Sequence, residues 1–145
     1  MIHEGQARKI IVGDSDRTVL ELLQIRLDLA GYHACVARTG SEVLEILRYH
    51  RPAAMILDTG LAQMNAFEVL EFLWRRGERP NCPILVTGRK LSVDDVQKAI
   101  GLGATLCLAK PFSGADMLDR VAHMLRPPRP PPVASPGPAY IEVRN

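Results

Sequence analysis

The stretch that decides the fold is Ala53–Leu57 (AAMIL), a run that is apolar at every position and is followed at once by Asp58. A run of this length and character suits a strand that is covered on both faces, as strands of a parallel sheet are. The same kind of run recurs on both sides of it in the sequence. The four further strand candidates are Lys9–Gly13 (KIIVG), Tyr32–Ala37 (YHACVA), Pro83–Thr87 (PILVT) and Thr105–Ala109 (TLCLA).

Amphipathic segments with helical periodicity separate these runs. The expected core-facing stripes are Val19, Leu22, Leu23, Leu27 and Ala30; then Val93, Val96 and Ile100; then Met117 or Leu118 with Val121 and Leu125. The expected helix caps are Asp16, Ser41 and Ser92 at the starts, with Gly31 and Gly103 where two helices should stop. Strand and helix alternate five times, which predicts an α/β fold with a parallel sheet and helices on both faces.

The chain has 145 residues, 47% of them hydrophobic and 23% charged, which fits one globular domain. Positive and negative side chains balance over residues 1–125, and the whole excess of +2 lies in residues 126–145. A balanced body argues against the broad basic face with which proteins bind nucleic acid, so no direct nucleic-acid partner is expected.

No apolar run approaches the roughly 20 residues of a membrane span, and residues 1–7 lack the pattern of a signal peptide. We therefore expect no membrane association and a cytoplasmic location. Cys35, Cys82 and Cys107 are odd in number and lack metal-ligand spacing, which indicates isolated reduced thiols.

The expected domain organisation is an N-terminal extension over residues 1–7, a folded domain over 8–126 and a proline-rich tail or linker over 127–145. Residues 127–138 (PPRPPPVASPGP) hold seven of the eleven prolines, which is typical of an extended linker outside the fold. Three interpretations of this ending stay open: a dispensable tail, a docking peptide, or a linker cut before an output domain.

Five polar residues follow or end the predicted strands, at the edge where open parallel sheets bind ligands. They are Asp14, Ser15, Asp58, Thr87 and Lys110. A carboxylate nucleophile, a second carboxylate, a hydroxyl and an ammonium at one edge suit the binding and transfer of a phosphoryl group. Each of these residues alone would be a weak signal, because strand ends commonly carry turn and surface residues.

The residue types suggest separate roles in that chemistry. Asp58 is a carboxylate that can attack phosphorus without a general base. Asp14, with Asp58, would hold Mg²⁺, a cation that prefers oxygen ligands. Lys110 would offset the charge of the phosphoryl oxygens, and Thr87 would donate a hydrogen bond to them.

Four stretches resemble the signature regions of bacterial response-regulator receiver domains, in order and at similar spacing. They are KIIVGDSD (9–16), MILDTGLAQMNAFEVL (55–70), ILVTG (84–88) and GATLCLAKPF (103–112). The resemblance spans about residues 8–125, and its most specific element is Lys110-Pro111-Phe112. It implies a flavodoxin-like (βα)5 three-layer sandwich with strand order 2-1-3-4-5, Asp58 as phosphoacceptor, and a cis bond between Lys110 and Pro111.

The same resemblance implies partners and a class of function. A histidine kinase or histidine phosphotransfer protein of a two-component phosphorelay would donate the phosphoryl group. A downstream protein would bind the face formed by the fourth helix, fifth strand and fifth helix, and a homodimer is an open alternative. The chain would be a signalling domain rather than an enzyme, with at most self-catalysed phosphoryl transfer and autodephosphorylation.

The sequence departs from the family pattern at two functional positions. Receivers usually carry two adjacent acids after the first strand, whereas Ser15 follows Asp14 here. Losing a charge about 4 Å from a cation forfeits on the order of 4 kcal/mol at an effective dielectric near 20, so Mg²⁺ binding should be weak. Ser15 would reach the ion through water, and Gly60 would contribute its backbone carbonyl. Cys107 replaces the aromatic that typically couples to Thr87 as the activation switch.

Two rival functions remain. The first is a pseudo-receiver that keeps the fold and binds partners without being phosphorylated, which Ser15 and Cys107 favour. The second is a haloacid dehalogenase-like phosphatase that uses Asp14 and Asp16, because residues 14–19 fit the opening motif of those enzymes. Those enzymes insert a flap after the first strand, and the sequence leaves no room for one because helical periodicity begins at once. The phosphatase interpretation also gives Asp58 no role.

Overall fold

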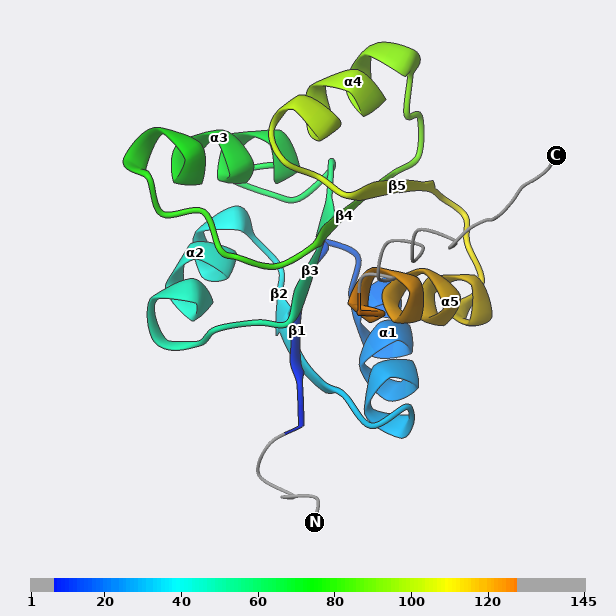
Figure 1. Cartoon of the computed structure of the whole chain (residues 1–145). Helices are drawn as coiled ribbons and strands as arrows, with labels where there is room; N and C mark the ends of the chain where they lie inside the picture. The colour runs from blue at the N-terminus through cyan, green and yellow to red at the C-terminus, as the bar shows by residue number, and fades with distance from the viewer. Residues whose placement is uncertain (1–6, 128–145) are drawn as a thin grey trace, which may run out of the picture.

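The structure is a computed structural model of the chain and describes residues 7–127. Five strands alternate with five helices, as predicted (Figure 1). The strands are β1 (Lys9–Gly13), β2 (His33–Ala37), β3 (Ala54–Asp58), β4 (Ile84–Gly88) and β5 (Leu106–Ala109). The helices are α1 (Arg17–Leu29), α2 (Gly40–Tyr49), α3 (Ala66–Arg76), α4 (Val93–Gly101) and α5 (Gly114–Leu125). In the described part of the chain, no helix has the length and apolar character that crossing a membrane requires.

All the strands are parallel, and their order is β2-β1-β3-β4-β5, which confirms the flavodoxin-like topology. The sheet lies between two helical layers: α1 and α5 cover one face, and α2, α3 and α4 cover the other (Figure 1). β3 is the central strand, and its last residue, Asp58, pairs in register with Thr87 of β4. This register brings two of the predicted site residues side by side.

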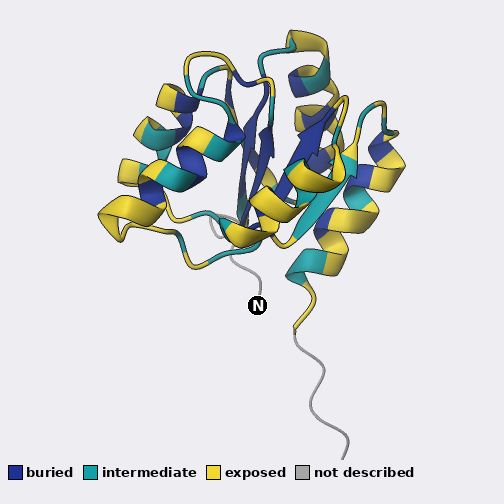
Figure 2. Cartoon of the chain, turned by 90° about the horizontal axis from the view of Figure 1, so that it is seen from above, coloured by how far each residue is buried: buried dark blue, intermediate teal, exposed yellow. Residues whose placement is uncertain are grey.

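The core lies on both faces of the sheet, and the strands form most of it (Figure 2). Every residue of β3 and of β4 is buried, as the uninterrupted apolar runs predict. Side chains alternate between the faces, so Ile56 packs toward α1 and α5 while Met55 and Leu57 pack toward α2 and α3.

Two of the predicted helical stripes are wrong in detail. In α1 the buried residues are Leu20, Leu23 and Leu27, whereas Leu22 is 36% exposed and Ala30 lies on the surface. In α4 the buried residue is Ala99, while Val93 is 73% and Ile100 48% exposed. Periodicity finds an apolar side of a helix, but contact with the sheet decides which part of that side is covered. α5 buries Met117 and Val121, as predicted.

The predicted helix ends are confirmed except at α2. Asp16 and Ser92 cap α1 and α4, and Gly31 and Gly103 follow α1 and α4 with φ of +95° and +105°. Ser41 is not a cap. α2 begins at Gly40, and the cap is Thr39, whose hydroxyl accepts a hydrogen bond from the Glu42 amide at 3.1 Å.

The early start of α2 follows from contacts with a distant loop. Thr39 forms a β-bridge with Ala62, and the Gly40 amide donates to the Ala62 carbonyl at 3.1 Å. These bonds hold the start of α2 against the loop after β3, so the helix begins before Ser41. A Cβ at position 40 would overlap the carbonyl oxygen of Met64 in that loop, and hence only glycine fits there.

We expect Gly40→Ala to lower the free energy of unfolding by about 1–3 kcal/mol, the usual cost of overpacking. The obstacle is backbone, which cannot rotate away as a side chain can. Urea unfolding followed by circular dichroism measures the change. The control is Gly101→Ala in α4, where the new methyl group would meet no atom within 4 Å apart from the local helix backbone and the neighbouring residues. This control should leave the protein as stable or stabilise it by up to about 1 kcal/mol. Equal effects of the two substitutions would contradict the packing explanation.

Candidate functional site

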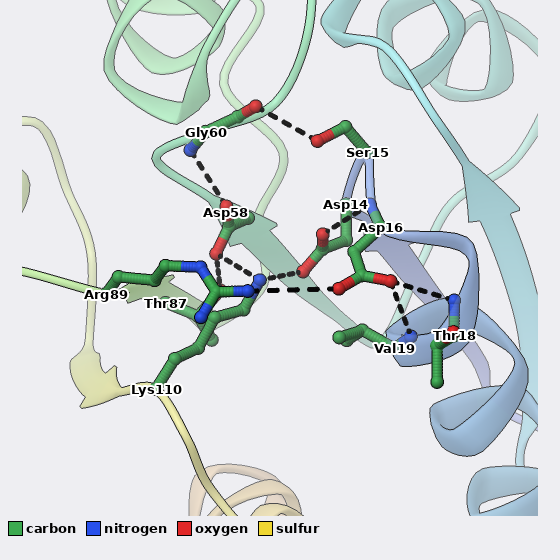
Figure 3. A network of polar contacts seen from close by, with 10 residues as sticks. All are labelled: Asp14, Ser15, Asp16, Thr18, Val19, Asp58, Gly60, Thr87, Arg89 and Lys110. Atoms are coloured by element: carbon green, nitrogen blue, oxygen red, sulfur yellow. Dashed lines mark hydrogen bonds and ion pairs between the residues drawn. The ribbon is translucent and has the colours of Figure 1, made fainter.

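Four of the five predicted site residues converge at the carboxyl ends of the strands (Figure 3). Asp14 follows β1, Asp58 ends β3, Thr87 lies next to the end of β4, and Lys110 follows β5. The first three residues are only 3%, 6% and 1% exposed, respectively. Buried polar side chains need partners, and these residues are partners of one another.

The Lys110 ammonium lies between the two carboxylates. Its Nζ is 2.7 Å from Oδ2 of Asp14 and 3.1 Å from Oδ1 of Asp58, and the Lys110 side chain is 6% exposed. Burial lowers the pKa of Lys110, but the hydrogen bonds and the attraction of both carboxylates outweigh it and raise that pKa overall. The residue is therefore a fixed positive charge at neutral pH.

Both oxygens of the Asp58 carboxylate accept hydrogen bonds. Oδ1 accepts from the Thr87 hydroxyl at 2.7 Å as well as from Lys110, and Oδ2 accepts from the Gly60 amide at 2.8 Å. Three donors from three segments fix the orientation of this side chain. Such preorganisation is what a reacting group in a binding site needs.

Asp14 lies deeper in the site, and its Oδ1 accepts from the Asp16 amide at 2.9 Å. Burial raises the pKa of Asp14 and the charge of Asp58 adds to the rise, while the bonds from Lys110 and from the Asp16 amide oppose it. Two carboxylates and one ammonium leave the site with one unbalanced negative charge when all three are ionised. A cation would relieve this excess.

Ser15 lies at the rim of the site and bridges two loops. Its hydroxyl donates to the Gly60 carbonyl at 3.2 Å, which connects the loop after β1 with the loop after β3 (Figure 3). Asp16 lines the same cavity, but other residues contact its carboxylate. Its Oδ1 accepts from the Thr18 amide at 2.9 Å, and its Oδ2 is 4.0 Å from Arg89.

Sequence reasoning missed two basic residues of the site. The cavity at the carboxylates has a volume of 490 Å³, and Arg89 and Lys90 line it together with Lys110. Both residues come directly after β4, so the strand-end rule that selected the other residues would also have found them. Both residues are exposed, and Arg89 lies 4.0 Å from Oδ2 of Asp16.

The residues of the site fit a bound Mg²⁺ ion, although the set of protein ligands is small. Asp14 and Asp58 offer carboxylate oxygens, and Gly60 offers a carbonyl. Within residues 7–127 there is no cluster of three or more acids, histidines or cysteines placed to bind a metal. Mg²⁺ keeps several waters and is often held by one or two carboxylates, so this oxygen set suits it.

The two predicted switch residues lie on the neighbouring strands β4 and β5, and they differ in their contact with Asp58. Thr87 contacts Asp58 directly, whereas Cys107 pairs in register with Val86 and packs on the α2–α3–α4 side of the sheet. Burial raises the pKa of the Cys107 thiol above its ordinary 9.0, so the thiol stays neutral at pH 7. The Lys110-Pro111 bond is cis, as the family resemblance implied.

Comparisons with known proteins identify the family of the chain. A family model described as the response regulator receiver domain matches residues 10–122. The chain is 34% identical over 122 residues to the response regulator MprA of Mycobacterium tuberculosis, covering 84% of this chain and 52% of that protein. The MprA of Mycobacterium avium is also 34% identical over 122 residues, with 84% and 53% covered. The chain thus spans about half the length of the curated relatives it matches.

Solved structures share the fold closely. The chemotaxis protein CheY4 of Vibrio cholerae superposes with a TM-score of 0.76 at 25% identity, covering 82% of this chain and 99% of that one. A CheY-like receiver domain protein from Methanospirillum hungatei also has a TM-score of 0.76, at 22% identity, with 83% and 94% covered. The second likeness supports the fold alone.

Proposed function

This chain belongs to the response regulator receiver family, and from that premise we propose that it accepts a phosphoryl group on the Asp58 carboxylate. The observation that carries the proposal is the environment of Asp58. Its carboxylate ends the central strand, lines a solvent-connected cavity, and is oriented by Lys110, Thr87 and the Gly60 amide. A nucleophile must be held in this way to react at a defined angle.

In the proposed reaction, an oxygen of Asp58 attacks the phosphorus of a phosphorylated donor. A bond forms between that oxygen and phosphorus, and the bond between phosphorus and the donor's leaving atom breaks, so the electron pair of that bond departs with the donor. The product is an acyl phosphate on Asp58. A carboxylate is already ionised at neutral pH, so the attack needs no general base.

Lys110 and Thr87 are proposed to stabilise the charge that the phosphoryl group brings. Lys110 is already within 3.1 Å of the attacked carboxylate, so its ammonium can move to a phosphoryl oxygen with little rearrangement. The Thr87 hydroxyl donates to Asp58 at 2.7 Å and can donate to the phosphoryl group once it is attached. Arg89 and Lys90 at the cavity mouth favour the approach of an anionic donor.

Asp14, Asp58 and the Gly60 carbonyl are proposed to hold Mg²⁺, with Ser15 contributing through water. When bound, the ion would neutralise phosphoryl oxygens, which is its usual contribution to phosphoryl transfer. Ser15 supplies no charge where the family usually has an acid. The Ser15 hydroxyl instead donates to the Gly60 carbonyl, so a neutral hydrogen bond connects the loops after β1 and β3 at this edge of the site.

We expect Ser15→Asp to tighten Mg²⁺ binding by at least about tenfold, because a second charge would face the ion at short range. Titration of Mg²⁺ followed by the backbone amide NMR shifts of Gly60 and its neighbours measures the affinity. Ser15→Ala serves as the control: it removes the hydroxyl without adding charge and should not tighten binding. Millimolar or tighter binding that is lost in Asp14→Ala but unchanged in Ser15→Asp would contradict the proposed ligand set.

The partners and boundaries belong to the same proposal. The donor would be a histidine kinase or a histidine phosphotransfer protein. Residues 8–126 would form the receiver and 127–145 a tail or linker, of which residues 128–145 lie outside the described residues. A downstream protein would bind the α4–β5–α5 face. The exposed apolar side chains of Val93 and Ile100 support this last part, because they leave apolar surface uncovered on α4, one of the three elements of that face.

The proposal is tested by incubating the chain with acetyl phosphate and Mg²⁺ and measuring its intact mass. We expect one phosphoryl adduct on the wild type. No adduct would favour the pseudo-receiver, for which Ser15 and Cys107 are the supporting observations. Steady release of phosphate from a monoester substrate would favour the phosphatase, which the position of Asp16 as a helix cap opposes.

A further inference from the structure

Helices α2 and α3 lie on the side of the sheet away from α1 and α5 (Figure 1). Their side chains line a groove. Its first part has a volume of 680 Å³, and its apolar lining comes from Leu44 and Leu47 of α2 and from Phe72 and Leu73 of α3. Its second part has a volume of 640 Å³ and lies between the loops that precede β3 and β4. Leu47 lines both parts, so they form one surface, here called the α2–α3 groove.

Arginines predominate at the edge of the α2–α3 groove. Four arginines line it, Arg48, Arg51, Arg76 and Arg79, against two glutamates, Glu45 and Glu78. Each glutamate is engaged: Glu45 lies 3.8 Å from Arg48, and Glu78 lies 3.1 Å from Arg76. Arg51 and Arg79 form no ion pair with any residue between 7 and 127. The groove therefore presents two uncompensated guanidinium groups.

Aromatic contacts hold two of these arginines in place. The Arg79 guanidinium lies 4.8 Å from the centre of the Trp74 ring, and a side chain at Gly103 would overlap it. The Arg76 guanidinium lies 5.3 Å from the centre of the Phe72 ring, which is itself 40% exposed. An arginine that is already ordered loses less side-chain entropy when it binds an anion.

We infer that the α2–α3 groove binds a segment of a partner protein in which apolar side chains alternate with acidic ones. The apolar side chains would cover Leu44, Leu47 and Phe72, and the carboxylates would pair with Arg51 and Arg79. Arginine and aromatic side chains around an apolar centre are the residues that dominate binding energy at protein interfaces. The balanced charge of residues 1–125 favours a peptide over nucleic acid, which proteins bind through a broad basic surface.

The α2–α3 groove is separate from the site of the proposed phosphoryl transfer. Arg51 precedes β3, whereas Asp58 ends it, and Asn81 precedes β4, whereas Thr87 lies near its other end. A partner can therefore occupy the groove without covering Asp58. This inference goes beyond the proposed function and does not depend on it.

The test uses the full chain, immobilised and exposed to a phage library of random dodecapeptides. We expect the selected peptides to be rich in Asp or Glu next to Leu, Ile or Phe. Binding of the synthesised peptides to the Arg51→Glu/Arg79→Glu variant should weaken by at least about tenfold, because like charges would then face each other. The matched control is Arg120→Glu/Arg126→Glu, which makes the same charge change at the exposed Arg120 of α5 and at the exposed Arg126 directly after that helix. This control should retain the affinity within about twofold.

A second variant, Phe72→Ala, tests the apolar half of the inference and should also weaken binding, since Phe72 is 40% exposed and its loss is compatible with folding. Circular dichroism and urea unfolding check that each variant is folded and about as stable as the wild type. Failure to select any peptide, or equal losses in both charge-reversal variants, would overturn the inference. The inference would also be overturned if no peptide is selected and an oligothymidine binds the wild type but not the Arg51→Glu/Arg79→Glu variant.

Discussion

The Asp58→Asn variant is expected to gain no phosphoryl group from acetyl phosphate and Mg²⁺ under conditions in which the wild type gains one. An amide lacks the negative charge and the free carboxylate oxygen that form the acyl phosphate. The substitution keeps the size of the side chain, and its oxygen can still accept from Thr87 or Lys110. Intact-mass measurement of both proteins after the same incubation gives the result directly.

Asp16→Asn is the matched control for this experiment. Asp16 caps α1 through its Oδ1, and asparagine caps helices about as well as aspartate, so the fold and the adduct should both be preserved. The pair of variants also separates the competing functions. If Asp16→Asn gains no phosphoryl group while Asp58→Asn still gains one, the reacting residue lies in the loop after β1. That result would contradict the proposal that Asp58 is the phosphoacceptor.

Lys110→Met is expected to lower the free energy of unfolding at pH 7 by about 3–5 kcal/mol, the usual cost of leaving a buried charge without its partner. Methionine has a similar length and keeps the apolar contacts of the stem, but it cannot compensate Asp14 and Asp58. These two side chains are only 4% and 8% exposed, so water cannot readily replace the ammonium. Urea unfolding followed by circular dichroism measures the loss.

Two comparisons separate this charge effect from packing. Lys90→Met removes the same charge from an exposed residue of the same cavity and should change stability by no more than about 0.5 kcal/mol. Lys110→Met combined with Asp14→Asn removes one of the uncompensated charges and should recover part of the loss. A double variant no more stable than Lys110→Met would indicate that lost packing is the cause.

The stability deficit of Lys110→Met should also depend on pH. Burial already raises the pKa of Asp14 in the wild type, and Lys110 opposes that rise, so the pKa of Asp14 should rise further in the variant. The folded variant then holds the Asp14 proton more tightly than the unfolded chain does. Its stability therefore falls as the pH rises above the ordinary value of 3.8 and recovers as the pH returns toward it. A deficit that is the same at pH 4 and pH 7 would contradict this explanation.

Much of the fold could be predicted from local patterns. The run at Ala53–Leu57 is apolar throughout because the central strand is covered on both faces, and the structure places β3 one residue later, at Ala54–Asp58. Asp16 and Ser92 cap helices because their short side chains reach the free amides of the first turn. Such signals work because they depend on neighbours within a few residues.

The errors fall where distant segments decide the local structure. Thr39 rather than Ser41 caps α2, because the loop after β3 holds the chain at Ala62. Val93 and Ile100 are expected from the sequence to face the core, but they are exposed, and Ala99 is the buried residue of α4. Periodicity along one helix contains no information about which neighbouring element covers it.

For the candidate site, too, some features follow from the sequence and others only from the tertiary structure. The sequence alone determined which residue types stand at the strand ends, since Asp14, Asp58, Thr87 and Lys110 each follow or end an apolar run. The tertiary structure alone decided that Lys110 lies 2.7 Å from Asp14, a residue 96 positions earlier, and that it also contacts Asp58. Distances between side chains depend on how whole strands and helices pack, and that packing sums many weak contacts between residues far apart in the chain. For the same reason the Ser15 bond to Gly60 and the arginine-lined α2–α3 groove emerge only from the folded chain.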